Sequence, residues 1–377
     1  SAGAYRRAMS EDAAADREFG EAVGRLGPAV LSGVDALEKA FRYLHPPNFP
    51  VLQERLAPIR DGLAEMLPIF EQAPTPTALS EFRRDLLAGS TLTLDALTRI
   101  VEPGDDGVMG ALGAMHGHAR AQALLYTLRV ALPPISSWFA EPFCRENLAA
   151  LEARPGSDAR VGLFRSGEGT GTEGPRGGFD LYVPESYDGS EAWPLVVALH
   201  GGSGHGADFM WSWLREARSR RFLLLSPTPR GSTWSLNAPE IDGRTLREIT
   251  AWVSAEWNVD REHVLLTGLS DGATMTGLVG LGEDVPFTHL APACGVLHPM
   301  NFAIGNLDRA RDKPIYLIHG ALDWMFPVSM AREAAKVFRD AGAALVFREI
   351  EDLSHTYPRE ENARIIEWFD PRRSSPA

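Results

Sequence analysis

A serine inside a tight glycine turn is the strongest chemical signal in the chain. Residues 268–272 read Gly-Leu-Ser-Asp-Gly, follow the apolar run Val264–Thr267 and precede a helical segment. In such a strand–turn–helix context the turn exposes the hydroxyl of Ser270 for nucleophilic attack, and the flanking glycines let strand and helix approach closely. Taken alone, the pentapeptide leaves open a helix N-cap serine in a glycine-rich turn.

A carboxylate and a histidine follow Ser270 in the order that this kind of nucleophile requires. Asp323 comes just after the predicted strand Ile315–Ile318, and His355 follows the predicted strand Leu345–Ile350. Of the ten histidines, only His355 is downstream of Asp323. Loops after parallel strands open at one edge of a sheet, so we predict a catalytic triad of Ser270, Asp323 and His355.

Two other carboxylates, Glu351 and Asp352, precede the histidine closely and could orient it instead. We favour Asp323, because a carboxylate so near in sequence to His355 would not reach its Nδ1 from the correct side.

A second glycine-rich turn supplies candidate donors for a developing negative charge. His200–Gly204 reads His-Gly-Gly-Ser-Gly and follows the predicted strand Pro194–Leu199. Acyl transfer places negative charge on a carbonyl oxygen, which preorganised backbone N–H groups stabilise. We predict one such donor at Asp271, directly after the nucleophile, and the other at Gly202 or its neighbour Gly201. A turn without a chemical role is the alternative.

Several tryptophans fall in or near the loops expected to border the cleft. They would form an apolar wall for an acyl or alcohol group, although large aromatic side chains are equally common in cores. From Trp211, Trp213, Trp234 and Trp324 we name Trp234, Trp324 and Trp211 as candidate substrate-binding residues.

The elements that must position these residues begin near Val161, where short apolar runs alternate with helical segments. This alternation predicts a mostly parallel sheet with helices on both faces. The predicted strands are Phe179–Val183, Pro194–Leu199, Phe222–Leu225, Val264–Gly268, Ile315–Ile318 and Leu345–Ile350. The predicted helices lie near Asp208–Arg218, Arg244–Trp257, Gly272–Leu281, Val328–Ala341 and Glu360–Phe369.

The preceding part of the chain has a helical pattern. Apolar residues between Leu52 and Met66 recur every three or four positions, as one face of an amphipathic helix requires. We therefore predict an all-helical N-terminal domain over residues 1–150, either a cap over the site or an interface, and a catalytic domain over 151–377. The same spacing occurs in Val30–Leu44, Met109–Leu132 and Ser137–Leu151.

Two features that could suggest other ligands have simpler explanations. His116 and His118 would point about 200° apart on a helix, so they cannot share one metal ion. The segment Gly167–Gly178 lacks the Gly-Lys-Ser/Thr ending of a phosphate-binding loop, and we expect a mobile hairpin loop or linker there. We expect neither a metal nor an organic cofactor.

The composition argues against several other classes of partner and of protein. A net charge of −13 argues against partners such as nucleic acid or an anionic membrane surface, while a neutral or cationic ligand remains open. Cys144 and Cys294 are too few for a disulfide framework, so we expect reduced thiols. Because the chain has no long apolar stretch and no apolar leader, we expect a cytoplasmic protein with no membrane span. A leader removed earlier would leave no trace. The formation of a homo-oligomer stays open.

Four motifs together resemble the α/β-hydrolase superfamily, most of all the carboxylesterase and phospholipase group and the poly(3-hydroxybutyrate) depolymerase-like esterases. The resemblance implies a serine esterase that acts on small-molecule esters through an acyl-enzyme. It does not cover the helical domain, and the chain lacks the secretion signal and disulfides common in extracellular depolymerases and feruloyl esterases, which argues against a polymer substrate. The motifs are Val197–Gly202, Gly268–Gly272, Gly320–Asp323 and Ser354–Pro358.

Two alternatives remain. A serine peptidase of the same fold would use the same triad, so these residues do not separate it from an esterase. A binding protein without turnover fits less well, because no residue of the predicted triad is missing.

Overall fold

The computed structural model describes residues 2–153, 158–166 and 176–375. The chain forms two compact units, Ser1–Phe139 and Ala140–Ala377, each of which is described by itself. Of the predicted glycine-rich loop, residues 167–175 lie outside the described part of the chain. Within that part, no helix combines the length and the apolar character needed to cross a membrane.

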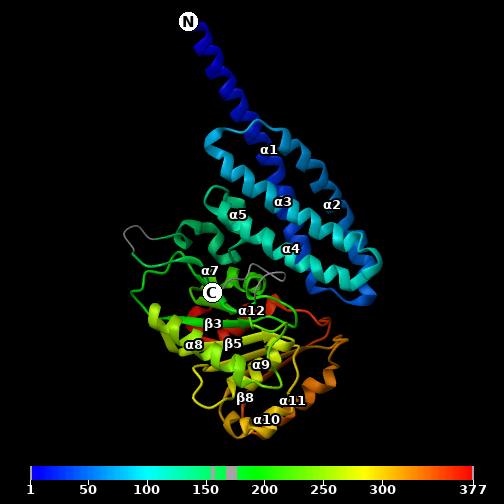
Figure 1. Ribbon diagram of the computed structural model, residues 1–377, viewed down its shortest axis with the longest axis vertical. Helices are drawn as coiled ribbons and strands as arrows, with labels where there is room; N and C mark the ends of the chain where they lie inside the picture. Colours follow the sequence, from blue (N-terminus) through cyan, green and yellow to red (C-terminus); the bar gives the residue numbers. More distant parts are fainter. Residues whose placement is uncertain (1, 154–157, 167–175, 376–377) are drawn as a thin grey trace. The chain divides into compact units, whose positions relative to one another are not determined.

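The first unit is a helical bundle, as predicted. Figure 1 shows α1 to α4 lying alongside one another. Gly33 of α1 permits the approach of α3, because a Cβ at that position would lie 2.7 Å from Thr93 Cγ2. The helices are α1 (Ala2–Arg42), α2 (Phe49–Gln72), α3 (Ser80–Val101), α4 (Gly107–Thr127) and α5 (Pro133–Trp138).

Two details of residues 1–150, the predicted helical domain, differ from the predictions. The helix α3 was not singled out, because small residues such as Gly89, Ser90 and Ala96 occupy much of its buried face and give a weak apolar pattern. The predicted helix Ser137–Leu151 is wrong. Pro142 begins a run of 3-10 turns over Pro142–Leu151 instead, and that run is kinked at Asn147.

His118 has a structural environment in the bundle. Its Nε2 lies 3.0 Å from Val34 O, and its Nδ1 lies 3.2 Å from Gln122 Nε2. Both ring nitrogens therefore have protein partners, in keeping with the expectation that His116 and His118 do not share a metal ion. The role of the bundle as a cap or an interface stays a prediction.

The second unit contains one sheet of eight strands in the order β1-β2-β4-β3-β5-β6-β7-β8. The strand β2 runs antiparallel to β1 and β4, and the other neighbouring pairs are parallel. This is the strand order of the α/β-hydrolase fold, so the predicted fold class is confirmed. The strands are β1 (Gly162–Ser166), β2 (Phe179–Val183), β3 (Trp193–Leu199), β4 (Leu223–Pro227), β5 (Val259–Leu269), β6 (His289–Ala293), β7 (Pro314–Gly320) and β8 (Ala344–Ile350).

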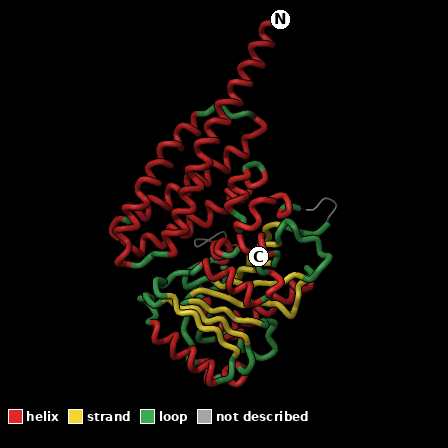
Figure 2. Tube along the Cα trace, turned by 180° about the vertical axis from the view of Figure 1, so that it is seen from behind, coloured by secondary structure: helices red, strands yellow, loops and turns green. Residues whose placement is uncertain are grey.

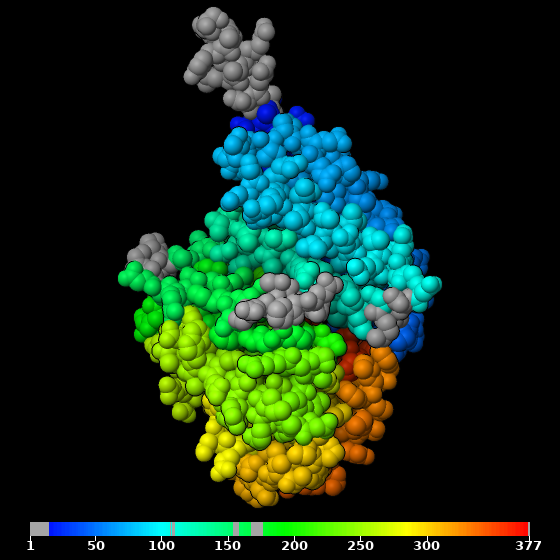
Figure 3. Space-filling view, in the orientation of Figure 1, coloured from blue at the N-terminus to red at the C-terminus, as the bar shows by residue number. Residues whose placement is uncertain are grey.

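Helices cover both faces of this sheet. Figure 2 shows the strands as one twisted layer with helices on either side. In Figure 1, α7 and α12 lie on one side and α8, α9 and α11 on the other. In the space-filling view the second group, in yellow-green to orange, forms the face turned to the viewer (Figure 3). The helices are α6 (Gly206–Phe209), α7 (Leu214–Arg220), α8 (Glu240–Glu256), α9 (Asp271–Gly280), α10 (Met300–Ala303), α11 (Val328–Asp340) and α12 (Asn362–Phe369).

The two strands that were not predicted have weak patterns for physical reasons. The strand β1 is at the edge of the sheet and is mostly exposed, so it does not need an apolar run. The strand β6 lies between β5 and β7 but contains Pro292. Because proline has no N–H to donate to a neighbouring strand, its presence argues against predicting a central strand from the sequence.

The structure divides the chain eleven residues before the predicted boundary at residue 150, between Phe139 and Ala140. Glu141 is buried in the second unit, where both of its carboxylate oxygens accept hydrogen bonds from the Arg220 guanidinium. Its backbone N–H donates to Ser219 Oγ. These contacts explain why residues 140–151 belong with the second unit.

The turn between β5 and α9 depends on close backbone approach. A Cβ on Gly268 would lie 2.5 Å from Gly272 C, and a Cβ on Gly272 would lie 2.4 Å from Leu199 O and 2.5 Å from His200 O. Real Cβ atoms do not approach backbone atoms this closely. Glycine at both positions therefore lets α9 begin directly against the end of β3.

We expect Gly272→Ala to lower the free energy of unfolding by about 3 kcal/mol or more, because the new methyl group meets backbone that cannot move aside. Urea unfolding followed by intrinsic fluorescence measures the change.

Gly277→Ala is the matched control, since a Cβ at this position of α9 meets nothing within 4 Å. Alanine should there stabilise the helix by about 0.5–1 kcal/mol. Equal stability of the Gly272→Ala variant and the native protein would contradict the packing described for the turn.

Candidate active site

The structure brings the three predicted triad residues into one hydrogen-bonded chain. Ser270 Oγ lies 2.9 Å from His355 Nε2, and His355 Nδ1 lies 2.8 Å from Asp323 Oδ2. Because a carboxylate can only accept, Nδ1–H donates to Asp323, and Nε2 is left to accept the proton of Ser270. This is the arrangement that nucleophilic attack by a serine hydroxyl requires.

Ser270 has a strained backbone, with φ 56° and ψ −118°. A non-glycine residue in this region costs roughly 1–3 kcal/mol and persists only where the surroundings hold it. Its N–H donates to Ala293 O at the end of β6, and its carbonyl accepts from Thr274 N at 2.9 Å and Thr274 Oγ1 at 3.2 Å. These bonds fix the serine at the tip of the turn.

Asp323 is held by its own loop. Its side chain is fully buried, and Oδ1 accepts from the backbone N–H groups of Met325 at 3.0 Å and Phe326 at 2.8 Å. The acid and base loops also touch directly, since Leu322 N–H donates to Leu353 O. The oxygen that reaches His355 Nδ1 thus belongs to Asp323, the carboxylate favoured over Glu351 and Asp352.

His319, near the end of β7, is a further residue of the site that the sequence does not single out. It is fully buried, its Nε2–H donates to Phe326 O at 2.8 Å, and Nε2 lies 3.4 Å from Asp323 Oδ2. The Phe326 ring in turn packs edge-on against the His355 ring, with centroids 5.2 Å apart. His319 therefore closes the acid loop. Its position four residues before the acid was the signal available in the sequence.

Cys294, His319 and Asp323 each offer a possible metal-ligand atom, and these atoms lie within 4.8 Å of one another. A metal ion there would have to compete for carboxylate oxygens that already accept from two backbone N–H groups and from His355. We therefore assign the cluster to the support of Asp323. Among the described residues, neither Cys294 nor Cys144 forms a disulfide.

The turn after β3 presents backbone N–H groups beside Ser270. Ser203 N–H donates to Ser232 O and Gly204 N–H donates to Gly201 O. Among the described residues, the N–H groups of Gly201 and Gly202 have no such backbone acceptor. A Cβ on Gly201 would lie 3.4 Å from Ser270 Cβ, so this part of the turn borders the serine. Its N–H groups are thus available to a substrate oxygen.

Trp234 contacts the turn after β3 through a hydrogen bond and a ring contact. Its Nε1–H donates to His200 O at 2.8 Å, and its ring lies 5.1 Å from the His200 ring. His200 Nδ1–H donates to Gly201 O. Burial lowers the pKa of His200 to about 3, so the ring stays neutral.

The other tryptophans have different environments. Trp211 and Trp213 are buried, and Trp213 packs against Phe222 and Tyr357. Trp324, next to Asp323, is 46% exposed. Of the three candidate substrate-binding residues, Trp324 is thus the one with surface available to a ligand; the substrate-binding role of all three stays a prediction.

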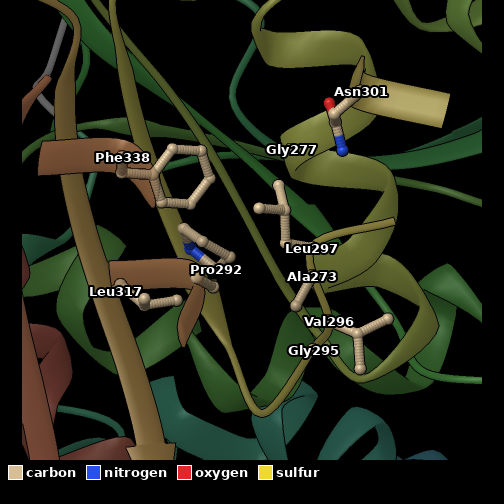
Figure 4. Close-up of a pocket in the computed structure, with 10 residues that line it drawn as sticks. Ala273, Gly277, Pro292, Gly295, Val296, Leu297, Asn301, Leu317 and Phe338 are labelled. Atoms are coloured by element: carbon tan, nitrogen blue, oxygen red, sulfur yellow. The ribbon is translucent and has the colours of Figure 1, made fainter. Parts of the chain in front are cut away.

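A small cavity lies between α9, α11 and the sheet (Figure 4). Its volume of about 20 Å³ suits one water molecule, which is too little for an acyl group. Figure 4 shows Phe338, Leu317 and Pro292 on one side and Leu297 and Ala273 on the other. We interpret this cavity as a packing void.

Comparison with known proteins adds to this geometry. Residues 240–370 match the family model described as Phospholipase/Carboxylesterase, a range that includes Ser270, Asp323 and His355. A probable feruloyl esterase C from Aspergillus terreus (strain NIH 2624 / FGSC A1156) is 25% identical over 166 residues. This alignment covers 42% of the present chain and 59% of the relative's length. The resemblance found in the sequence is confirmed: the second unit is an α/β-hydrolase domain similar to carboxylesterases and phospholipases.

Three solved structures are similar to parts of the chain. A thermostable esterase is 23% identical, with a TM-score of 0.44 over 55% of this chain and 62% of its own. An S-formylglutathione hydrolase from Staphylococcus aureus is 15% identical, with a TM-score of 0.45 over 58% and 98%. An acylaminoacyl peptidase from Pyrococcus horikoshii is 17% identical, with a TM-score of 0.43 over 56% and 41%. The fold assignment comes from the strand order and register.

The neutral state of His200 predicts a pH-dependent stability. The unfolded chain binds a proton at this residue below a pH of about 6.5, whereas the folded protein does not until about 3, so stability falls as the pH falls through this window. Between pH 7.5 and 5.0 the loss attributable to His200 should be about 2 kcal/mol. Urea unfolding at both pH values measures it.

The variant His200→Asn keeps a side-chain donor but cannot titrate, so its loss over the same interval should be smaller by that amount. His289, whose pKa is lowered by burial to about 4, contributes equally to both proteins and cancels. An identical pH dependence of the two proteins would show that His200 does not stay neutral in the fold.

Proposed function

We propose that the second unit is a serine hydrolase that cleaves carboxylic esters through an acyl-enzyme intermediate. The observation that carries this proposal is the hydrogen-bonded chain from Ser270 Oγ through His355 to Asp323. The match to the phospholipase and carboxylesterase family over residues 240–370 supports the same activity.

In the acylation step, Ser270 Oγ attacks the ester carbonyl carbon while its proton passes to His355 Nε2. The tetrahedral intermediate then expels the alkoxide, which leaves as the alcohol after taking the proton from Nε2. Asp323 stabilises the imidazolium that exists between these two transfers. The products of this step are the acyl-Ser270 ester and the free alcohol.

Deacylation repeats the sequence with water in place of the serine. His355 Nε2 accepts a proton from water as its oxygen attacks the acyl carbon, and the same proton returns to Ser270 Oγ as the acid leaves. The proton transfers between His355 and Ser270 are short, because Nε2 lies 2.9 Å from Ser270 Oγ.

The negative charge on the carbonyl oxygen would be met by the N–H of Asp271 and by the N–H of Gly202 or Gly201. Asp271 N–H is at the first position of α9, where the helix dipole adds partial positive charge. Removal of one donor of this kind typically costs about 10²–10³ in kcat. In this proposal Trp324 contributes an apolar surface for the substrate.

The variant Ser270→Ala tests the nucleophile. It should retain the fold but lose roughly 10⁶-fold in kcat on 4-nitrophenyl acyl esters, because the triad acts as a unit. A fluorophosphonate probe should label the native protein with one equivalent and the variant not at all. Substantial residual turnover by the folded variant would place the nucleophile elsewhere.

Ser254→Ala is a suitable control, since the hydroxyl of this serine of α8 donates to Thr250 O within its own helix and has no other partner among the described residues. It should leave both labelling and turnover unchanged. Rates on aminoacyl 4-nitroanilides measured in parallel distinguish the esterase from the peptidase alternative, and absence of labelling in the native protein would favour the binding protein.

A further inference from the structure

Asp271, the residue after the nucleophile, places a carboxylate beside the turn that would bind the carbonyl oxygen. Its Oδ2 accepts a hydrogen bond from Thr233 Oγ1 at 2.5 Å. The same Oδ2 would lie 2.9 Å from a Cβ on Gly202, so the carboxylate packs directly over this glycine. The residue is half-buried and remains open to a ligand.

This carboxylate lies in the first turn of α9, where the helix dipole adds partial positive charge, but no side-chain cation compensates it among the described residues. Among the described residues, Thr233 is its hydrogen-bond partner and no lysine, arginine or histidine nitrogen lies within ion-pair distance. Arg176, a cation that borders the same turn, directs its guanidinium to Gly204 O at 2.9 Å and Gly231 O at 2.6 Å instead. A neutral hydroxyl donor on one oxygen leaves most of the negative charge in place.

The position of this charge matters for catalysis. Negative charge develops on the substrate oxygen next to the N–H groups of Gly202 and Asp271, and a nearby unpaired carboxylate opposes it. The Asp271 charge therefore raises the barrier for a neutral ester, because it repels the developing oxyanion. For an anionic ester it also repels the charged group of the substrate, so the barrier is higher still. A substrate with a positive group near the carbonyl would offset the Asp271 charge.

We propose that Asp271 is a specificity-determining residue that favours esters whose acyl group carries an ammonium group. The proposal rests on the hydrolase function proposed above and names its substrate class. The net charge of −13 acts in the same direction, because it attracts cations and repels anions at long range.

The test compares three 4-nitrophenyl esters that share one leaving group. Their acyl chains end in a trimethylammonium group, in the isosteric neutral tert-butyl group, or in a carboxylate. We expect the native protein to prefer the ammonium ester over its neutral isostere by about tenfold in kcat/KM, and to hydrolyse the anionic ester most slowly. The preference should weaken at 1 M salt, where charges are screened within about 3 Å.

Two variants should shift this preference in opposite directions. Asp271→Asn keeps the backbone N–H and the side-chain shape, so it should bring the ammonium-to-neutral ratio close to one, partly through faster hydrolysis of the neutral ester. Thr233→Val removes the donor to the carboxylate and should raise the ratio. A purely structural role of Asp271 would slow all three esters alike in both variants.

Glu333→Gln removes the same charge from the exposed face of α11 and serves as the control, with an unchanged ratio expected. If Asp271→Asn retains the native preference, the proposal is wrong while the hydrolase function stands. If the native protein hydrolyses none of the esters and does not react with the fluorophosphonate, the proposed function falls and this inference falls with it.

Discussion

The close approach of three backbone segments at the turn before α9 is the constraint on which the site depends. A helix that begins against the end of β3 places Ser270 beside the glycine turn that follows this strand, and only glycine at position 272 permits that contact. Ser270, with φ 56°, lies in this same turn and forms its hydrogen bond to His355 from there. Packing and chemistry therefore cannot be separated at this point of the chain.

A second close approach joins the acid to the base. A Cβ on Gly320 would lie 2.2 Å from Leu353 O, so the loop that carries His355 crosses directly over the end of β7. The same strand end carries His319, which fastens Phe326 O and so fixes the loop of Asp323. The distance of 2.8 Å between Asp323 Oδ2 and His355 Nδ1 follows from two loops that are held to each other. Residues of the site that are far apart in sequence are thus positioned by backbone contacts between the loops at the carboxyl ends of the strands.

The sequence predicted those features that depend on local residue order. The glycine turn around Ser270 and the order of acid and base identified the fold and the residues that meet in it. Features that depend on partners distant in sequence were not predicted. The proline at position 292 argued against a strand where the central strand β6 lies, and nothing in the local sequence distinguishes His319 from an ordinary strand residue. The hydrogen bond from the indole N–H of Trp234 to the backbone oxygen of His200 is likewise not revealed by any local pattern, and the substrate-binding role of Trp234 stays a prediction.

The two aspartates of the site show how surroundings divide one residue type between two tasks. Asp323 accepts from two backbone N–H groups and from His355, with His319 close by, so donors balance its charge, and in the proposed mechanism it orients the base. Among the described residues, Asp271 accepts a hydrogen bond only from the hydroxyl of Thr233. In the proposal, its negative charge therefore acts on a substrate bound beside Ser270. In the proposed mechanism, the carboxylate surrounded by N–H donors orients the base, whereas the carboxylate without a side-chain cation among the described residues selects the substrate. The number of donors around each aspartate, read from the structure, is what separates these two roles.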